Sequence, residues 1–209
     1  MNGTAPTKIA RLATNLAIHP QYVGRYLQHN LRQKLTPLDL EVPFFSYAAI
    51  DFLTAYLQPD MTVFEFGTGG STLFFAQRVK SVTSVENSIE RFEAVVSRVK
   101  EKNLVNVEIK LRPFDVKNPQ DFEDSEYLQS IHGETFDVIV IDGAEEWTPV
   151  RPLCFQQAEQ WVKPGGIIVV DDSWRYAMLH GKHHAKRFET FRSVGPCRPG
   201  VTSTDIFFY

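Results

Sequence analysis

The stretch VFEFGTGGST, residues 63–72, decides how the rest of this chain is interpreted. A run rich in aromatic and β-branched residues leads into three glycines within four positions, and a helical pattern follows. Side chains at Gly67, Gly69 and Gly70 would block backbone conformations and close approaches that such a turn needs. The helix that opens there presents free backbone N–H groups to a ligand. We therefore predict a strand, a turn that binds a nucleotide-like ligand, and a helix.

The same alternation continues after this turn. Apolar runs occur at TVFEF, SVTSVE, NVEIK, FDVIVID and GGIIVVDD, and helical patterns at 71–79, 88–102 and 149–162 separate them. Strands that are apolar at nearly every position and are joined by helices indicate a parallel sheet covered on both faces. Two further strands, at 189–194 and 204–209, predict a hairpin. The predicted fold class is α/β: a doubly wound, mostly parallel seven-stranded sheet with a C-terminal antiparallel hairpin.

Three segments lie outside this alternation. Amphipathic patterns predict two helices at 9–17 and 22–31, and a third helix at about 44–57. The segment from Pro119 to Ile131 predicts a short acidic helix that is too polar for the core. Pro164 and Gly165 are expected to end the helix before the fifth strand.

Composition is that of an ordinary globular domain. The chain has 209 residues, of which 43% are hydrophobic and 22% are charged, so a core needs neither a disulfide nor a structural metal. Cys154 and Cys197 lack the paired spacing of a zinc site. We expect one domain over 1–209, with an N-terminal helical extension or lid at 1–42 and an α/β core at 43–209.

Charge and hydropathy limit the partners. The net charge of −3 argues against a nucleic-acid partner. No apolar run is long enough to span a bilayer, so we expect a cytoplasmic protein. Residues 1–38 contain no acid, and we interpret their basic residues as a cationic outer face, with a lid or a docking face for an anionic partner as the alternative. These basic residues are Lys8, Arg11, Arg25, Arg32 and Lys34.

Two residues indicate which class of nucleotide-like ligand the glycine turn binds. The dinucleotide pattern G-x-G-x-x-G would place its third glycine at position 72, where this chain has Thr72. Glu65, two residues before Gly67, would repel a pyrophosphate but suits a ligand with an ammonium and a sulfonium group. Both residues favour S-adenosylmethionine over a nicotinamide dinucleotide.

With those residues in view, EFGTGGS followed by SVTSVE resembles the first two motifs of the class I S-adenosylmethionine-dependent methyltransferases, and the resemblance covers roughly residues 61–172. It implies a Rossmann-like methyltransferase fold. In that family an acid that ends the second strand accepts hydrogen bonds from both ribose hydroxyls, which implies this role for Glu86. Glu86 follows Gly67 by 19 residues, close to the spacing of one strand–helix–strand unit.

The resemblance also implies the other cofactor contacts. Asp115 would meet the adenine amino group, with a solvated turn acid as the alternative. Asp142, at the tip of the strand FDVIVID, would lie near the transferring methyl group. The predicted cofactor-binding residues are Glu65, Gly67, Thr68, Gly69, Gly70, Ser71, Glu86, Asn87, Asp115 and Asp142.

Three acids, Asp142, Asp171 and Asp172, are expected at the same rim of the sheet. This layout partly resembles the catechol-type O-methyltransferases, where such a rim would bind a divalent cation through oxygen ligands. Those enzymes place an amide residue after the second acid, where this chain has Ser173. We favour no metal, with rim acids that contact substrate or cap the next helix; a divalent metal is the alternative.

The segment WRYAMLHGKHHAKRF, residues 174–188, follows that rim and contains no acid. We interpret it as a solvated basic helix beside the acceptor, and a basic surface there would suit an acidic or phosphorylated acceptor. His180 is the candidate general base of this segment, since the pKa of an imidazole lies near working pH. Asp142 is the first candidate for that catalytic role.

These residues predict an enzyme that methylates a small-molecule acceptor at oxygen with S-adenosylmethionine as cofactor. Two alternatives stay open: an NAD(P)-dependent oxidoreductase on a similar sheet, and a relative that binds the cofactor without catalysis. Sheets of this kind often associate through helices or edge strands, so a homodimer is compatible with the sequence.

Overall fold

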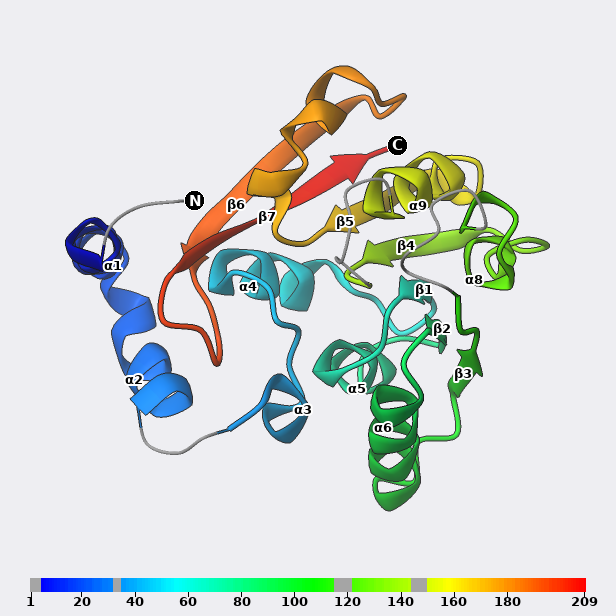
Figure 1. Cartoon of the computed structure of the whole chain (residues 1–209), viewed down its shortest axis with the longest axis horizontal. Coiled ribbons are helices and arrows are strands. Elements are labelled where there is room, and N and C mark those ends of the chain that lie inside the picture. Colours follow the sequence, from blue (N-terminus) through cyan, green and yellow to red (C-terminus); the bar gives the residue numbers. More distant parts are fainter. Residues whose placement is uncertain (1–4, 32–34, 115–121, 144–149) are drawn as a thin grey trace.

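The computed structural model describes residues 5–31, 35–114, 122–143 and 150–209. The strands in that part of the chain are β1 (Thr62–Phe66), β2 (Ser81–Glu86), β3 (Val107–Leu111), β4 (Phe136–Ile141), β5 (Val162–Val170), β6 (Arg187–Val194) and β7 (Val201–Phe208). They form one sheet in the order β3-β2-β1-β4-β5-β7-β6 (Figure 1). β1 to β5 pair in parallel, whereas β7 is antiparallel to both β5 and β6. The predicted sheet and its C-terminal hairpin are confirmed.

Helices cover both faces of this sheet, with α4 and α5 on one face and α8 and α9 on the other (Figure 1). The described helices are α1 (Ala5–Ile18), α2 (Val23–Leu31), α3 (Pro37–Leu40), α4 (Tyr47–Tyr56), α5 (Gly70–Ala76), α6 (Ile89–Glu101), α8 (Glu126–Gln129) and α9 (Val150–Ala158). Three short 3-10 helices accompany them: η1 (Pro20–Tyr22), η2 (Ser173–Arg175) and η3 (Ala177–Gly181). No helix in the described ranges has the length and hydropathy that crossing a membrane requires.

Alternation along the strands produces a core on each face. In β1, Val63 packs with residues of α4 and α5, whereas Phe64 and Phe66 pack with residues of α8 and α9. All three side chains are fully buried. Each such side chain stabilises the fold by about 1.5–3 kcal/mol relative to exposure, so β1 is fixed from both sides.

The strand order reverses beside β1, because β2 and β3 lie on one side of it and β4 and β5 lie on the other. Glu65 of β1 is in register with Ser84 of β2 and with Val140 of β4. In an open α/β sheet, the crevice beyond the carboxyl ends of the strands at such a reversal is the usual ligand site. The fold therefore places the glycine turn, which follows β1, in that crevice.

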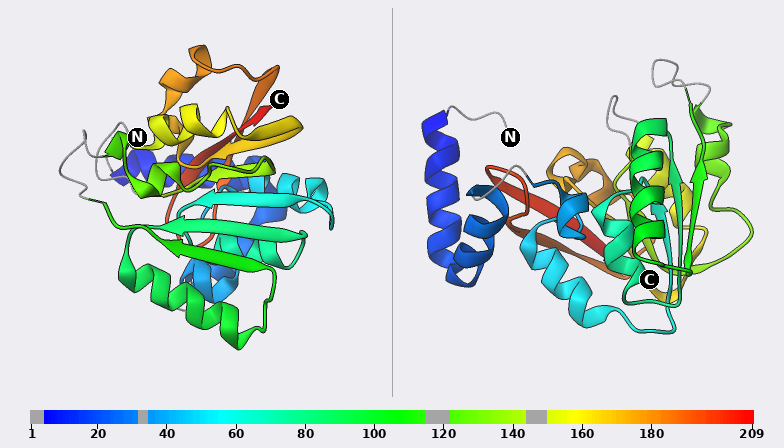
Figure 2. Two further views of the ribbon diagram at one scale, coloured as in Figure 1. Left: turned by 90° about the vertical axis from the view of Figure 1, so that its right-hand side faces the viewer. Right: turned by 90° about the horizontal axis from the view of Figure 1, so that it is seen from below.

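The first two helices pack at the end of the sheet formed by β6 and β7, away from α6 and β3 (Figure 2). The side chain of Asn15 accepts a hydrogen bond from the backbone N–H of Val194 at 3.0 Å. Tyr22 is buried, and its ring centroid lies 5.6 Å from that of Tyr47 in α4. Lys8 and Arg11 are exposed on α1, as the predicted cationic outer face requires.

The Pro-Gly-Gly segment differs from its prediction. α9 ends at Ala158, and Pro164 and Gly165 lie within β5 instead of ending the helix. The backbone N–H of Gly165 donates to the carbonyl of Tyr209 at 2.9 Å. The register between β4 and β5 shifts along this stretch, so the segment forms an irregular start to the strand.

The segment 174–188 is not the predicted basic helix. It contains η3 and most of η2, and β6 begins at Arg187. Tyr176 and Leu179 are both buried in the core on the α9 face. Their spacing of three residues matches the 3.0-residue turn of a 3-10 helix, which explains the short turns found here.

The acidic segment before β4 also differs. Residues 119–121 lie outside the described residues, and α8 covers only Glu126–Gln129. The prediction that this segment is too polar for the core is wrong, because its apolar side chains are buried while Glu123 and Asp124 stay exposed. The buried side chains are Phe122, Tyr127, Leu128 and Ile131.

Candidate functional site

A cavity of about 900 Å³ opens at the carboxyl ends of β1, β2, β4 and β5. The glycine turn and the residues after β2 line one side, and residues after β4 and β5 line the other. The segment before α4 and the β6–β7 turn close the remaining walls. The lining residues are Leu35, Thr36, Pro37, Leu38, Phe44, Thr68, Gly69, Gly70, Ser71, Asn87, Ser88, Arg91, Val95, Asp142, Gly143, Arg151, Asp172, Arg175 and Cys197.

Two glycines of the turn are required by close backbone approach. Gly67 has φ +102°, and a Cβ there would lie 2.9 Å from Cα of Gly143. A Cβ at Gly70 would lie 2.1 Å from the carbonyl oxygen of Pro37 and 2.4 Å from that of Val42. The turn therefore packs against the β4 tip on one side and against the α3 segment on the other.

Glu86 ends β2 and is fully buried behind the cavity lining. One carboxylate oxygen accepts hydrogen bonds from the backbone N–H of Thr68 at 3.0 Å and from its hydroxyl at 2.9 Å. The other oxygen accepts from the backbone N–H groups of Asn87 and Ser88, both at 2.9 Å. These bonds tie the glycine turn to the start of α6 and fix the carboxylate. The Thr68 hydroxyl is the one side-chain donor among them, so a ligand hydroxyl could take its place.

Glu65 lies on β1 beneath the same turn and is also buried. One carboxylate oxygen accepts a hydrogen bond from the hydroxyl of Ser84 at 2.8 Å, while the other has no hydrogen-bond partner among the residues that the structure describes. Burial raises the pKa of Glu65 to about 7, although the nearby hydroxyls of Ser71, Ser84 and Thr72 act to lower it. A nearby cationic group would stabilise the ionised form.

Asp142 follows β4, and its side chain is 23% exposed at the cavity. The buried guanidinium of Arg151 lies 3.2 Å from its carboxylate. The same guanidinium donates to the carbonyl oxygens of Gly143 at 2.9 Å and Asp171 at 2.9 Å. Arg151 therefore holds the tips of β4 and β5 together and orients Asp142.

Asp171 and Asp172 follow β5 and contact a second arginine. Nη1 of Arg198 donates to Asp172 at 2.9 Å, and Nη2 lies 3.5 Å from the buried carboxylate of Asp171. Burial would raise the pKa of Asp172, but Arg198 and the hydroxyl of Thr202 outweigh it and lower that pKa. The pKa of Asp171 is raised well above its usual range by burial and by the charge of Asp142.

The rim acids do not fit a divalent cation. In the described part of the chain, no three His, Cys, Asp or Glu side chains are placed to share a metal ion. Asp142 is bonded to Arg151, and Arg198 lies against both Asp171 and Asp172. Two unit charges about 4 Å apart repel by about 4 kcal/mol near a protein surface, and a divalent ion would double that cost.

His180 is not placed as a general base of this cavity. Its Nε2 lies 2.6 Å from the carboxylate of Asp205, and its ring stacks on Phe188 with centroids 4.3 Å apart. It does not contribute to the cavity lining. The side chain thus joins η3 to the β6–β7 hairpin, and a catalytic role of His180 stays a prediction.

The cavity unites some predicted cofactor residues and places others behind its wall. Glu65, Gly67 and Glu86 lie behind the lining, and Asp115 lies outside the described residues. Their roles, and those of the lining residues, stay predictions. The predicted residues that line the cavity are Thr68, Gly69, Gly70, Ser71, Asn87 and Asp142.

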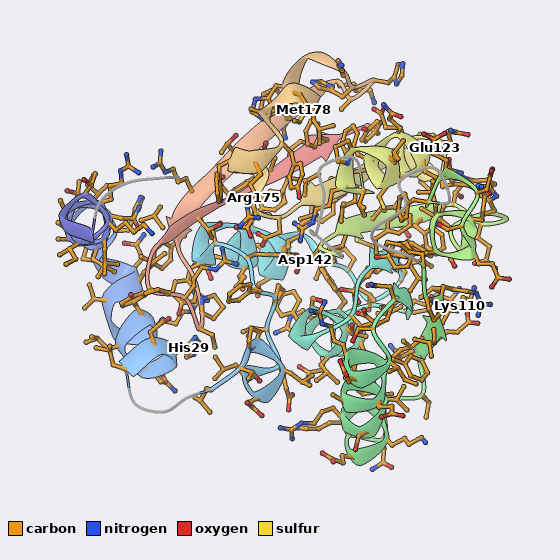
Figure 3. All side chains as sticks on the ribbon, viewed as in Figure 1. His29, Lys110, Glu123, Asp142, Arg175 and Met178 are labelled. Carbon is orange, nitrogen blue, oxygen red and sulfur yellow. The ribbon has the colours of Figure 1, made fainter. Side chains whose placement is uncertain are left out.

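Two residues of the site were missed by sequence reasoning. Arg151 shares an apolar helical stripe with Cys154, Phe155 and Ala158, so a charge in that stripe was an available signal. Arg198 lies in a turn whose sequence gives no such signal. A third arginine, Arg175, belongs to the basic segment 174–188 of the sequence analysis. In the structure it lines the cavity with Asp142, near the centre of the molecule (Figure 3).

Comparisons with known proteins agree with this geometry. A model of the methyltransferase domain family matches residues 64–173, just over half of the chain. No curated protein is similar enough in sequence to count as a match.

Many solved structures share the fold. A Klebsiella pneumoniae protein described as an O-methyltransferase has a TM-score of 0.61 at 14% identity, covering 97% of this chain and 98% of its own. The O-methyltransferase TomG from Streptomyces achromogenes, solved with S-adenosylmethionine, has a TM-score of 0.59 at 16% identity, covering 96% and 97%. An rRNA methylase from Streptococcus thermophilus has a TM-score of 0.54 at 16% identity, covering 76% and 91%. With the family match, this chain belongs to the class I S-adenosylmethionine-dependent methyltransferases.

Proposed function

We propose that this protein transfers the methyl group of S-adenosylmethionine to an oxygen atom of a small acidic molecule. The observation that carries the proposal is the cavity of about 900 Å³ in which the glycine turn faces Asp142. That volume lies at the upper end of the range for small-molecule sites, so it suits a cofactor together with a small acceptor.

On the cofactor side, the chain offers a turn without side chains at Gly69 and Gly70 and an acid at the end of β2. Glu86 is held by three backbone N–H groups, so little reorganisation is needed when ribose hydroxyls replace the hydroxyl of Thr68. Glu65 adds a buried carboxylate beneath the turn, which favours a cationic ligand.

On the acceptor side, Asp142 is the proposed proton acceptor. When bound, the cofactor supplies a methyl group that its sulfonium already activates. The protein then has to align the acceptor oxygen with that methyl carbon and to exclude water. The carboxylate of Asp142 takes the proton from the acceptor hydroxyl as the oxygen–carbon bond forms and the carbon–sulfur bond breaks, leaving its electrons on sulfur.

Arginines support an acidic acceptor. Arg91 and Arg175 are both exposed and line the cavity, and a guanidinium group pairs well with a carboxylate or phosphate such as an acidic acceptor would carry. The fold likeness agrees with a small acceptor, because TomG, an O-methyltransferase involved in tomaymycin synthesis, covers 96% of this chain.

We also propose the division into a catalytic core at 43–209 and an N-terminal extension at 1–42. The part of the extension that lines the cavity is 35–38, beside the glycine turn, whereas no residue of α1 or α2 lines it. Residues 35–38 are therefore the part of the extension that can act as a lid.

Isothermal titration calorimetry with S-adenosylmethionine and S-adenosylhomocysteine tests this proposal. We expect both to bind, and Glu86→Ala to weaken binding by more than about 100-fold, because two hydrogen bonds to a charged group are lost. Glu108→Ala, which removes an exposed acid from the neighbouring strand, is the matched control. Unchanged affinity in Glu86→Ala would remove the assignment, and tight binding of NADH would favour an oxidoreductase.

A further inference from the structure

An arginine from the far end of the chain reaches the acids at the tip of β5. Arg198 lies in the β6–β7 turn, and its side chain is 11% exposed. One nitrogen donates to Asp172 at 2.9 Å, and the other donates to the carbonyl of Phe44 at 2.6 Å and lies 3.5 Å from Asp171. The guanidinium carbon also lies 3.7 Å from the centroid of the Phe44 ring.

These contacts place a permanent positive charge between the two acids. A guanidinium stays protonated at every pH at which proteins function, so Arg198 supplies this pair with positive charge at the place where a bound cation would supply it. Threonine hydroxyls complete the arrangement: Thr204 donates to Asp171 at 2.8 Å and Thr202 donates to Asp172 at 2.7 Å. These two carboxylates are thus already bonded to groups other than a metal ion.

The third rim acid, Asp142, also has an arginine partner. Arg151 comes from α9, and its guanidinium contacts Asp142 at 3.2 Å and the backbone of Gly143 and Asp171. Two arginine side chains from different parts of the chain therefore contact all three acids. A divalent ion placed among these acids would have to displace at least one arginine.

We propose that Arg198 is the resident cation of this site and excludes a divalent metal ion from Asp171 and Asp172. The inference deepens the proposed methyl transfer and rests on it. The acceptor then has no need for two adjacent oxygens that chelate a metal, as a catechol has. A single hydroxyl beside an anionic group satisfies the site, with Asp142 as proton acceptor and Arg151 holding Asp142 in place.

Titration with Mn²⁺, followed by electron paramagnetic resonance of the free ion and by thermal unfolding, tests the inference on the full chain. We expect the wild-type protein to leave Mn²⁺ free at about 1 mM, which exceeds the dissociation constants of most oxygen-ligand sites. Arg198→Met removes the charge but keeps a stem that can cover Phe44. We expect this variant to bind Mn²⁺ at least tenfold more tightly than the wild type.

Arg25→Met is the matched control, because Arg25 also pairs with an aspartate, Asp51 at 2.6 Å, but far from the cavity. It should bind Mn²⁺ no better than the wild type. If Arg198→Met is unstable, Mn²⁺ should raise its Tm, because an ion that binds the folded state stabilises it. That shift should be absent in the wild type and in Arg25→Met.

Binding of Mn²⁺ by the wild type as tightly as by Arg198→Met would overturn the inference. It is also overturned if Arg198→Met neither binds Mn²⁺ nor is stabilised by it, since Arg198 would then not be the group that excludes the ion. Binding of S-adenosylhomocysteine, measured in the same samples, separates this failure from failure of the proposed function. If the wild-type protein does not bind S-adenosylhomocysteine, the proposed methyl transfer is wrong, independently of the result with Mn²⁺.

Discussion

The two sides of the cavity hold their acids in opposite ways. On the β1–β2 side, Glu65 and Glu86 receive hydrogen bonds from hydroxyl and backbone N–H groups, and neither forms an ion pair within the described residues. On the β4–β5 side, the acids Asp142, Asp171 and Asp172 contact Arg151 and Arg198. The acids of the first side thus have no cationic partner among the described residues, whereas arginines offset the negative charge of the second side.

This difference suggests how one cavity takes two unlike ligands. The side whose acids have no arginine partner suits a cationic cofactor, and the side whose acids contact arginines tolerates an acidic acceptor. The contacts differ in origin as well. Each acid of the first side is held by residues close to it in the chain, on the adjacent strand or in the turn that follows that strand, whereas Arg198 lies 26 residues beyond Asp172.

The largest expected effect comes from removing the arginine contacts of the β4–β5 side. Arg151→Met should lower the free energy of unfolding by about 3–5 kcal/mol, because Asp142 and two carbonyl groups lose a buried charged partner. Urea unfolding measures it. The matched control is Lys110→Met, which breaks the more exposed pair with Glu108 and should cost less than about 1 kcal/mol. Similar losses in the two variants would contradict the structural role of Arg151.

The next effect concerns the uncompensated charge of Glu65. Its pKa in the folded protein is about 7, against 4.5 as a reference, so the folded state holds a proton that the unfolded state releases between these values. The free energy of unfolding should therefore fall by about 3 kcal/mol as pH rises from about 4.5 to 7. The Glu65→Gln variant has no carboxylate at this position, so this part of the pH dependence of the unfolding free energy should be absent from it.

The measurement is the difference in unfolding free energy between Glu65→Gln and the wild type across that pH range, which cancels the other titrating groups. Saturating S-adenosylmethionine should reduce the difference, since a cationic ligand stabilises the ionised carboxylate. A difference that does not vary with pH would show that Glu65 titrates as an exposed acid does.

Two neighbouring glycines give the smallest and most specific effects. Gly70→Ala should lower the free energy of unfolding by about 1–3 kcal/mol, because its methyl group would overlap the carbonyls of Pro37 and Val42. A Cβ at Gly69 meets no atom of the described residues within 4 Å, so Gly69→Ala should leave the free energy of unfolding within about 0.5 kcal/mol of the wild type.

Cofactor affinity separates the two variants further. The methyl group of Gly69→Ala would occupy space in the cavity, and we expect S-adenosylhomocysteine to bind about tenfold more weakly, a loss of about 1.4 kcal/mol. Calorimetry on the purified variant measures this. Unaltered affinity in Gly69→Ala would place the ligand away from the glycine turn.

The contrast between the two sides also explains what could be predicted from sequence. β1 and β2 match their predicted bounds because apolar runs and the glycine turn are local signals. The local pattern predicts that Pro164 and Gly165 end a helix, but the structure places both in β5. The backbone hydrogen bond from Gly165 to Tyr209 joins residues far apart in the chain. Periodicity carries no information on such pairings.

The same limit applies to the site. Glu86 and the glycines follow from spacing within one strand–helix–strand unit, which fixes their geometry locally. The role of Arg198 depends on the β6–β7 turn reaching back to β5 and to Phe44, which no local pattern encodes. His180 was assigned by residue type alone, and its pairing with Asp205 of β7 could be found only from the fold.

The most direct test of the account is a crystal structure with S-adenosylhomocysteine. We predict electron density along residues 68–71, with both ribose hydroxyls within about 3.2 Å of the Glu86 carboxylate and the sulfur facing Asp142. Density in another part of the molecule, such as the second cavity beside Glu159 and His184, would contradict the account. So would a ribose that makes no contact with Glu86.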